Sequence, residues 1–227
     1  LVSEEQLKLI ELENQTGGAL CTALLAIDEI DGEEPLIVTN SDHVIDWDVP
    51  EIIEWFNQNQ ADFGTVTFDA VHPKWSYVRF NDDGEIEEAA EKRPISRNAI
   101  AGFYYFRKGS DFVEAAQRAI LKRSTHAGKY FLSSSMNEMV LMGRRGLAYQ
   151  IPNASYTNFF DVSAVKAYND RCKQEAFQNE NEIRRLTRRY VSAFNSRRLE
   201  EIGSLMHDEF VLEDPSIKRI ETRQHVT

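Results

Sequence analysis

The stretch Pro35-Leu36-Ile37-Val38-Thr39, followed by Asn40-Ser41-Asp42, decides the fold class of this chain. Short apolar runs of this kind are typical of strands buried on both faces of a parallel sheet. A strong helix former, Ala19 to Ile27, precedes the run, and Asp48 and Pro50 open a second helix that is predicted from Glu51 to Asn59. Helix, strand and helix alternate here, so the sequence predicts an α/β fold.

The next hundred residues predict more strands than helices. Alternating polar and apolar residues follow Gly64, and Asn81-Asp82-Asp83-Gly84 is typical of a hairpin turn. Ser110 is placed to cap one helix, and Ser135 with Glu138 has the spacing of a capping box for another. Strands are predicted over 65–70, 76–80, 100–106 and 146–151, and helices over 110–122 and 136–142. This domain is therefore predicted to be α/β with an antiparallel insert.

The chain is predicted to contain two domains. A closing helix is predicted over Asp161 to Tyr168, after which Arg171 to Glu182 loses its apolar periodicity and becomes charged. Apolar residues return at helical spacing from Ile183, followed by a short helix to Met206 and a strand from Glu209 to Glu213. We place the boundary in the charged stretch and predict domains over 1–175 and 176–227.

Composition excludes several classes of partner. The net charge of -11 repels a nucleic-acid backbone, although a local group of cations and backbone amides can still bind a small anionic substrate. Two cysteines are too few for a disulfide framework, and no stretch has the length and hydrophobicity of a membrane span. We therefore expect a cytoplasmic protein without nucleic-acid or membrane partners, and a homo-oligomer is left open.

Three short patterns are candidates for chemistry. Asp42 follows a strand of an α/β domain, where ligands collect, and its carboxylate suits Mg²⁺; capping of the next turn is the alternative interpretation. Glu91-Lys92 offers an acceptor for sugar hydroxyls beside a cation for a phosphate, with an exposed ion pair as the alternative. Gly17-Gly18 before a helix could let the backbone approach a nucleotide.

Taken together, these patterns resemble the sugar-phosphate nucleotidyltransferases across roughly Gly17 to Tyr168. The residues that carry the resemblance are Thr16-Gly17-Gly18-Ala19, the run from Pro35 to Asp42, Glu91-Lys92 with Pro94, Ser96, Ala99, Gly102 and Tyr104, and Asn137-Glu138. Order and spacing match together, which is more specific than any single motif.

The resemblance implies a role for each matching position. Asp42 would bind Mg²⁺ together with the nucleotide, and the elbow Thr16-Gly17-Gly18 would face the base. Glu91, Gly102 and Asn137 would contact the sugar, and Lys92 its phosphate. Catalysis would then rest mainly on Asp42 and Lys92, with Mg²⁺ as the cofactor. The implied partners are a nucleoside triphosphate and a phosphorylated small molecule.

The implied fold is a Rossmann-like mixed sheet of the GT-A type. The family's glycine-rich triphosphate loop has no counterpart before Leu1, so we expect the sheet to be incomplete at its N-terminus and nucleotidyl transfer to belong to the complete protein. A second metal ligand is expected at Asn158 or Asp161. From about Asn181 the tail resembles the start of a nuclear-transport-factor-2-like (SnoaL-like) domain, an α+β cone.

The implied reaction joins a nucleoside triphosphate to a sugar 1-phosphate, giving a nucleotide sugar and pyrophosphate. Positioning and charge neutralisation dominate such transfers. Two other interpretations stay open. One is a cytidylyltransferase acting on a non-sugar phosphate, such as a phosphorylated amino alcohol, and the other is a non-catalytic module that binds nucleotide sugars.

Overall fold

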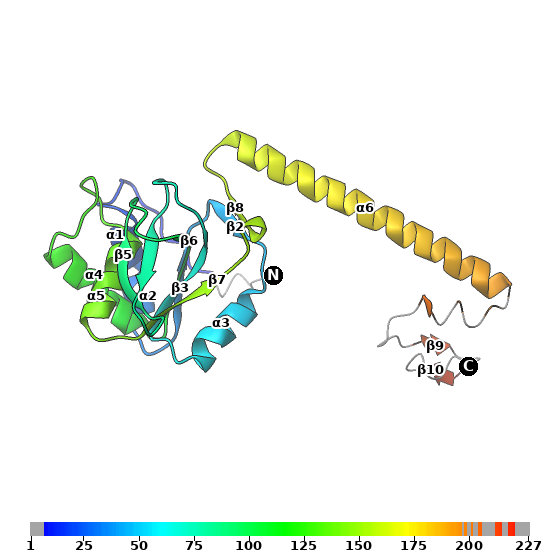
Figure 1. Cartoon of the computed structure of the whole chain (residues 1–227), viewed down its shortest axis with the longest axis horizontal. Helices are drawn as coiled ribbons and strands as arrows, with labels where there is room; N and C mark the ends of the chain where they lie inside the picture. The colour runs from blue at the N-terminus through cyan, green and yellow to red at the C-terminus, as the bar shows by residue number, and fades with distance from the viewer. Residues whose placement is uncertain are drawn as a thin grey trace. The chain divides into compact units, whose positions relative to one another are not determined.

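A computed structural model describes residues 7–196, 198, 201, 204–205, 212–214 and 218–220 of the chain. The chain divides into two compact units, Leu1–Phe160 and Asp161–Thr227. The first unit is built around one sheet, and the second begins with a long helix (Figure 1).

The first unit is built from short helices and strands. In chain order it contains α1 (Ala19–Ala23), the 3-10 turn η2 (Leu24–Ala26), α2 (Ile27–Ile30), β1 (Leu36–Thr39), β2 (His43–Ile45), α3 (Val49–Gln58), β3 (Phe63–Asp69), β4 (Tyr77–Phe80), β5 (Ile86–Ala90), β6 (Asn98–Phe106), α4 (Gly109–Leu121), α5 (Leu132–Leu141), β7 (Gly146–Gln150), the 3-10 turn η3 (Asn153–Ser155) and β8 (Tyr156–Asn158).

Six of these strands form a mixed sheet in the order β5-β4-β6-β3-β7, with β1 also paired to β6. β3 and β7 run parallel, and the other pairs are antiparallel. β2 and β8 form a separate antiparallel ribbon. The predicted α/β class and the antiparallel hairpin of β4 and β5 are thus both confirmed.

Side chains of the central strand β6 alternate between two cores. Tyr104 and Phe106 belong to the core with α4 and α5, whereas Phe103 and Tyr105 belong to the core with α3. Figure 1 shows α3 apart from α4 and α5, on the other face of the sheet. The two buried apolar side chains of α3, Ile52 and Phe56, each stabilise the fold by roughly 1.5–3 kcal/mol.

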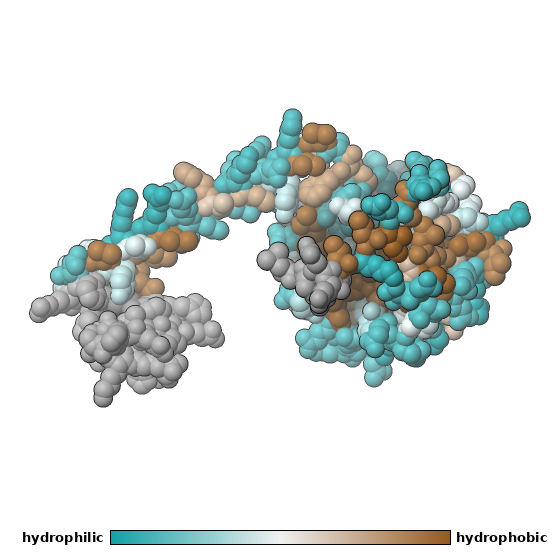
Figure 2. Space-filling model, turned by 180° about the vertical axis from the view of Figure 1, so that it is seen from behind, coloured by the Kyte–Doolittle hydropathy of each residue, from teal (hydrophilic) through white to brown (hydrophobic). Residues whose placement is uncertain are grey.

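The prediction for β1 was wrong in its direction and in its burial. β1 pairs antiparallel with the second half of β6, from Leu36 opposite Phe106 to Thr39 opposite Phe103. Its residues alternate between half-buried and exposed, and Ile37 remains 37% exposed. A strand of only four residues does not show which neighbour it will pair with, so the pattern could not fix its direction. Figure 2 shows further hydrophobic side chains on the surface of this unit.

Helix starts were predicted less well than helix positions. α5 begins at Leu132, one turn before the predicted capping box; Ser135 is buried and donates to the Leu132 carbonyl, and Glu138 pairs with Lys122. α4 likewise begins at Gly109, so Ser110 lies inside it. Asp48 does cap α3, since its carboxylate accepts from the backbone N–H of Glu51.

In the second unit a single helix, α6 (Val162–Asn195), replaces the predicted closing helix and charged linker, so the predicted boundary at 175/176 falls inside it. Ion pairs such as that of Arg184 with Glu180 stabilise this helix at i,i+4 spacing.

The described part of the tail contains two short strands. β9 (Leu212–Asp214) and β10 (Lys218–Ile220) pair antiparallel. Part of the predicted cone segment, including the end of the short helix at Met206, lies outside the described residues, and the cone stays a prediction. Within the described residues no helix has the length and hydrophobicity needed to cross a membrane.

Candidate active site

One cavity of the first unit gathers predicted site residues from three parts of the sheet. It has a volume of about 240 Å³ and is lined by Asp42 after β1, by Glu91 and Lys92 after β5, and by Gly102 within β6. Asn158, a candidate for the second metal ligand, lines it as well. Residues that are far apart in the sequence therefore meet here.

Asp42 is held at the rim by the ribbon of β2 and β8. Its carbonyl accepts from the N–H of Phe159 at 2.8 Å, and its side chain is 52% exposed. In the same ribbon His43 lies opposite Asn158, whose Oδ1 is buried without a hydrogen-bond partner. Carboxylate and amide oxygens are ligands that Mg²⁺ accepts, usually with several waters and substrate phosphates. The described residues contain no group of three His, Cys, Asp or Glu side chains able to hold a metal.

The buried side chain of His43 lies next to the carboxylate of Asp42. Its side chain is only 4% exposed, and its Nδ1 lies 3.9 Å from the nearer carboxylate oxygen of Asp42. Burial lowers the pKa of His43, and the charge of Asp42 opposes this shift only in part. The ring next to Asp42 is therefore neutral at ordinary pH, and it does not line the cavity itself. Sequence reasoning gave the histidines no role, although this one directly follows Asp42.

Gly102 allows β6 to pass close to this turn. Its φ of +75° is unfavourable for other residues, and a Cβ there would lie 2.9 Å from the side-chain nitrogen of Asn40 and 3.1 Å from Cε1 of His43. The backbone N–H of Asn40 also donates to the Gly102 carbonyl at 3.2 Å. A larger residue would push the turn that carries Asp42 away from the sheet.

Glu91 and Lys92 form no ion pair with each other among the described residues. Oε2 of Glu91 accepts from the hydroxyls of Ser76 at 2.5 Å and Ser133 at 2.9 Å. Lys92 has a left-handed backbone with φ 51°, and its Nζ lies 5.2 Å from the ring centre of Phe131. The charged groups of these two side chains thus contact different neighbours.

An aromatic wall of the cavity was not predicted. Trp75 lies 5.2 Å from Phe160 and 5.5 Å from Tyr156 between ring centres. The ammonium of Lys74 lies 4.5 Å from the Trp75 ring centre and 5.2 Å from that of Phe160. Burial raises the pKa of Tyr156 to about 12, so this phenol is neutral at ordinary pH. Lys74 and Lys92 are thus both cations of the cavity lining.

The glycine elbow borders the cavity but does not line it. Ala19, the residue after the elbow, lines the cavity. Within the elbow, the hydroxyl of Thr16 donates a hydrogen bond to the Gly18 carbonyl. Gly18 has φ +137°, and a Cβ there would lie 2.2 Å from the Tyr130 carbonyl oxygen. The close approach of the Tyr130 backbone is thus one reason for a glycine at position 18.

The model of the nucleotidyl transferase family matches residues 3–171, well over half of the 227 residues. The chain belongs to this family. No curated protein sequence shows a significant match to it.

Solved structures of nucleotidyl transferases and pyrophosphorylases resemble the chain in fold. A nucleoside-diphosphate-sugar pyrophosphorylase from Vibrio cholerae RC9 is 20% identical with a TM-score of 0.60, covering 69% of this chain and 66% of that one. An apo-UDP-glucose pyrophosphorylase is 18% identical with a TM-score of 0.58, covering 72% and 63%. The chain spans less than two thirds of the length of either protein. These likenesses confirm the predicted Rossmann-like mixed sheet.

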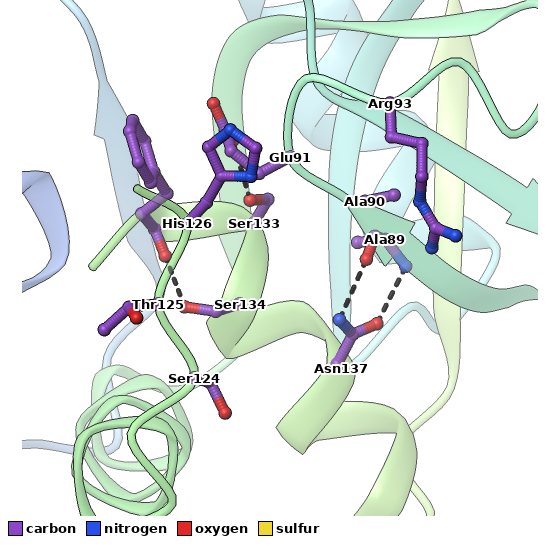
Figure 3. Close-up of a pocket in the computed structure, with 11 residues that line it drawn as sticks. Ala89, Ala90, Glu91, Arg93, Ser124, Thr125, His126, Ser133, Ser134 and Asn137 are labelled. Carbon is purple, nitrogen blue, oxygen red and sulfur yellow. Dashed lines mark hydrogen bonds between the residues drawn. The ribbon is translucent and has the colours of Figure 1, made fainter. Parts of the chain in front are cut away.

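In this member of the family Asn137, which was predicted to contact substrate, lies beside a second cavity of about 270 Å³ (Figure 3). Both polar atoms of its amide are bonded to the backbone of Ala89, each at 2.8 Å. Glu91 and Phe131 line both cavities. The structure thus brings Asp42, Glu91, Lys92 and Gly102 together and leaves Asn137 next to them, with its amide already bonded.

Proposed function

We propose that this chain carries the acceptor side of an enzyme that transfers a nucleotidyl group from a nucleoside triphosphate to a sugar 1-phosphate. The observation that carries the proposal is the gathering of Asp42, Glu91 and Lys92 in one cavity of a family member. A carboxylate that accepts sugar hydroxyls, a cation for a phosphate and a metal-binding oxygen are the groups this reaction requires.

Each residue has a part in the proposed reaction. Lys92 binds the phosphate of the acceptor, Glu91 accepts a hydrogen bond from a sugar hydroxyl, and Gly102 lets the ring lie against β6. One oxygen of the bound phosphate attacks the α-phosphorus of the nucleotide, and the bond to the leaving pyrophosphate breaks as the new one forms. Holding these atoms in line supplies most of the acceleration.

Asp42 and Asn158 are the residues that would hold Mg²⁺. When bound, such an ion neutralises negative charge on phosphate oxygens. The carboxylate of Asp42 is half exposed, so it is open to an ion that arrives with the nucleotide. The nucleotide itself would reach the site past the elbow of Thr16, Gly17 and Gly18, which precedes the lining residue Ala19.

A second candidate acceptor is a phosphorylated amino alcohol, as in a cytidylyltransferase. The rings of Trp75, Tyr156 and Phe160 favour it, because aromatic faces bind organic cations. However, the ammonium of Lys74 already lies over two of these rings, where an organic cation would bind. This arrangement supports an uncharged sugar ring better than a second positive charge.

Thermal-shift measurements test the two candidates directly. Mg²⁺ with each nucleoside triphosphate is screened first, followed by glucose 1-phosphate and phosphocholine, because a ligand that binds the native state raises the melting temperature by mass action. We expect stabilisation by glucose 1-phosphate and not by phosphocholine, and pyrophosphate release by the complete protein when a nucleotide is added. The proposal fails if no sugar phosphate stabilises the chain, and binding without turnover by the complete protein would favour the non-catalytic module.

A further inference from the structure

We propose that Ser133 and Asn137 are positioning residues, which act through Glu91 and Lys92 and do not touch the acceptor. The inference rests on the proposed function for its effect on acceptor binding. Ser133 and Asn137 are four residues apart on α5 and therefore share one helix face. That face lies against the end of β5, and Figure 3 shows both contacts.

Asn137 takes the place of a neighbouring strand. β5 is the last strand of the sheet order, so one of its edges has no strand partner in that sheet. The amide oxygen of Asn137 accepts from the Ala89 N–H, and its amide nitrogen donates to the Ala89 carbonyl. These two bonds fix the backbone two residues before Glu91.

Ser133 and Ser76 together fix the Glu91 carboxylate. Both hydroxyls donate to Oε2, and Ser133 is 2% exposed, so its hydroxyl is shielded from water. In the described part of the chain no hydrogen bond to Oε1 is found. Hydrogen bonds to charged groups are the stronger ones. One carboxylate oxygen is thus occupied by the protein, and the other is left for an acceptor hydroxyl.

The backbone at Lys92 needs this support. A non-glycine residue with φ 51° is unfavourable and persists only where its surroundings hold it. Asn137 and Ser133 hold the chain immediately before this residue. Loosening either contact would let the turn relax and move the ammonium of Lys92 together with the carboxylate of Glu91.

The first test replaces Ser133 by alanine in the full chain, with binding measured by calorimetry. We expect the dissociation constant of glucose 1-phosphate to rise about tenfold, the effect of losing a hydrogen bond to a charged group, while that of the nucleotide stays within about twofold. Ser133→Thr keeps the hydroxyl and should restore binding. The matched control is Ser134→Ala, because this neighbouring hydroxyl donates to the Phe131 carbonyl and not to Glu91.

A double variant separates positioning from direct contact. In the Glu91→Gln background, adding Ser133→Ala should weaken glucose 1-phosphate binding little further, because Ser133 acts through the carboxylate. An equal loss in both backgrounds would mean that Ser133 contacts the acceptor itself and would overturn the proposal.

A measurement without ligand keeps this test independent of the proposed function. Ser133→Ala should shift the ¹³C carboxylate resonance of Glu91, and Asn137→Ala, which removes the acceptor of the Ala89 N–H, should speed hydrogen exchange at that amide, with circular dichroism confirming the fold. If wild type does not bind glucose 1-phosphate, the proposed function fails, and these two signals still decide the positioning role. Unchanged signals in both variants would refute it.

Discussion

The two cavities that meet at Glu91 differ in what their polar groups are bonded to. In the larger one, of about 270 Å³, the amide of Asn137 is bonded to Ala89, and Arg93 pairs with Glu88 at 2.7 Å. In the smaller one, of about 240 Å³, Asn158 has a buried oxygen without a partner, and the carboxylate of Asp42 is half exposed. Volume alone would favour the larger cavity. Polar atoms that are still free to bind a ligand point to the smaller one.

The largest expected effect is on turnover, from Asp42→Ala. We expect a loss of about a thousandfold or more in pyrophosphate release by the complete protein with glucose 1-phosphate, Mg²⁺ and its nucleotide, because the carboxylate proposed to bind the metal is removed. Ser124→Ala, in the larger cavity, is the matched control and should stay close to wild type. Activity of Asp42→Ala within about tenfold of wild type, roughly 1.4 kcal/mol of barrier, would contradict the metal role.

A smaller effect is expected on acceptor affinity. Lys92→Ala should raise the Michaelis constant for glucose 1-phosphate by roughly tenfold to a hundredfold and that for the nucleotide much less, since a charged hydrogen bond to phosphate is lost. Arg93→Ala removes the adjacent cation, which lines the other cavity and is 68% exposed, and should change neither constant more than about threefold. An equal rise in both constants for Lys92→Ala would place its ammonium elsewhere.

Gly102→Ala should lower stability by about 1–3 kcal/mol, because it adds strain at positive φ and crowds Asn40 and His43. Gly128→Ala is a matched control, with φ +74° and no atom within 4 Å of the added Cβ. The difference between the free energies of unfolding of the two variants, measured in urea, gives the contribution of crowding to the loss of stability. Equal losses would show that the turn at Asp42 has room to move.

The smallest effect concerns Tyr156 in the smaller cavity. Burial raises its pKa to about 12, so the folded state keeps a proton that the unfolded state loses near pH 10. Its contribution to stability is therefore full below about pH 10 and is lost as the pH rises toward 12. In a titration followed at the tyrosinate absorbance, Tyr156→Phe should match wild type up to about pH 11. A difference that appears near pH 10 would show that the ring is exposed to water.

The sequence predicted the charged half of this site better than its aromatic half. Asp42 and Glu91 each stand where a strand ends, so local patterns and family spacing mark them. Trp75 and Phe160 meet only in the folded chain, and neither has a local pattern that suggests a ligand. The positioning role of Asn137 depends on which strand lies at the sheet edge, which spacing does not reveal.

The fold shows the same division. Alternation and turn residues predicted the hairpin of β4 and β5, because each of these signals is local. The partner of β1 depends on a strand more than fifty residues later in the chain, and no local signal indicates it. The charged stretch within α6 shows that loss of apolar periodicity also describes an exposed helix with ion pairs along its surface.

The left-handed backbone of Lys92 has a consequence for how this site can evolve. Position 92 requires a residue that tolerates φ 51° and carries a positive charge. Glycine and asparagine tolerate this φ but have no positive charge, whereas valine and isoleucine meet neither requirement. A library at position 92, scored separately for folded yield and for acceptor binding, should separate these two groups. Few single substitutions of Lys92 would keep both the backbone conformation and the positive charge. A change of acceptor preference is therefore expected to begin at Lys74 or Phe160, whose backbones carry no such restriction.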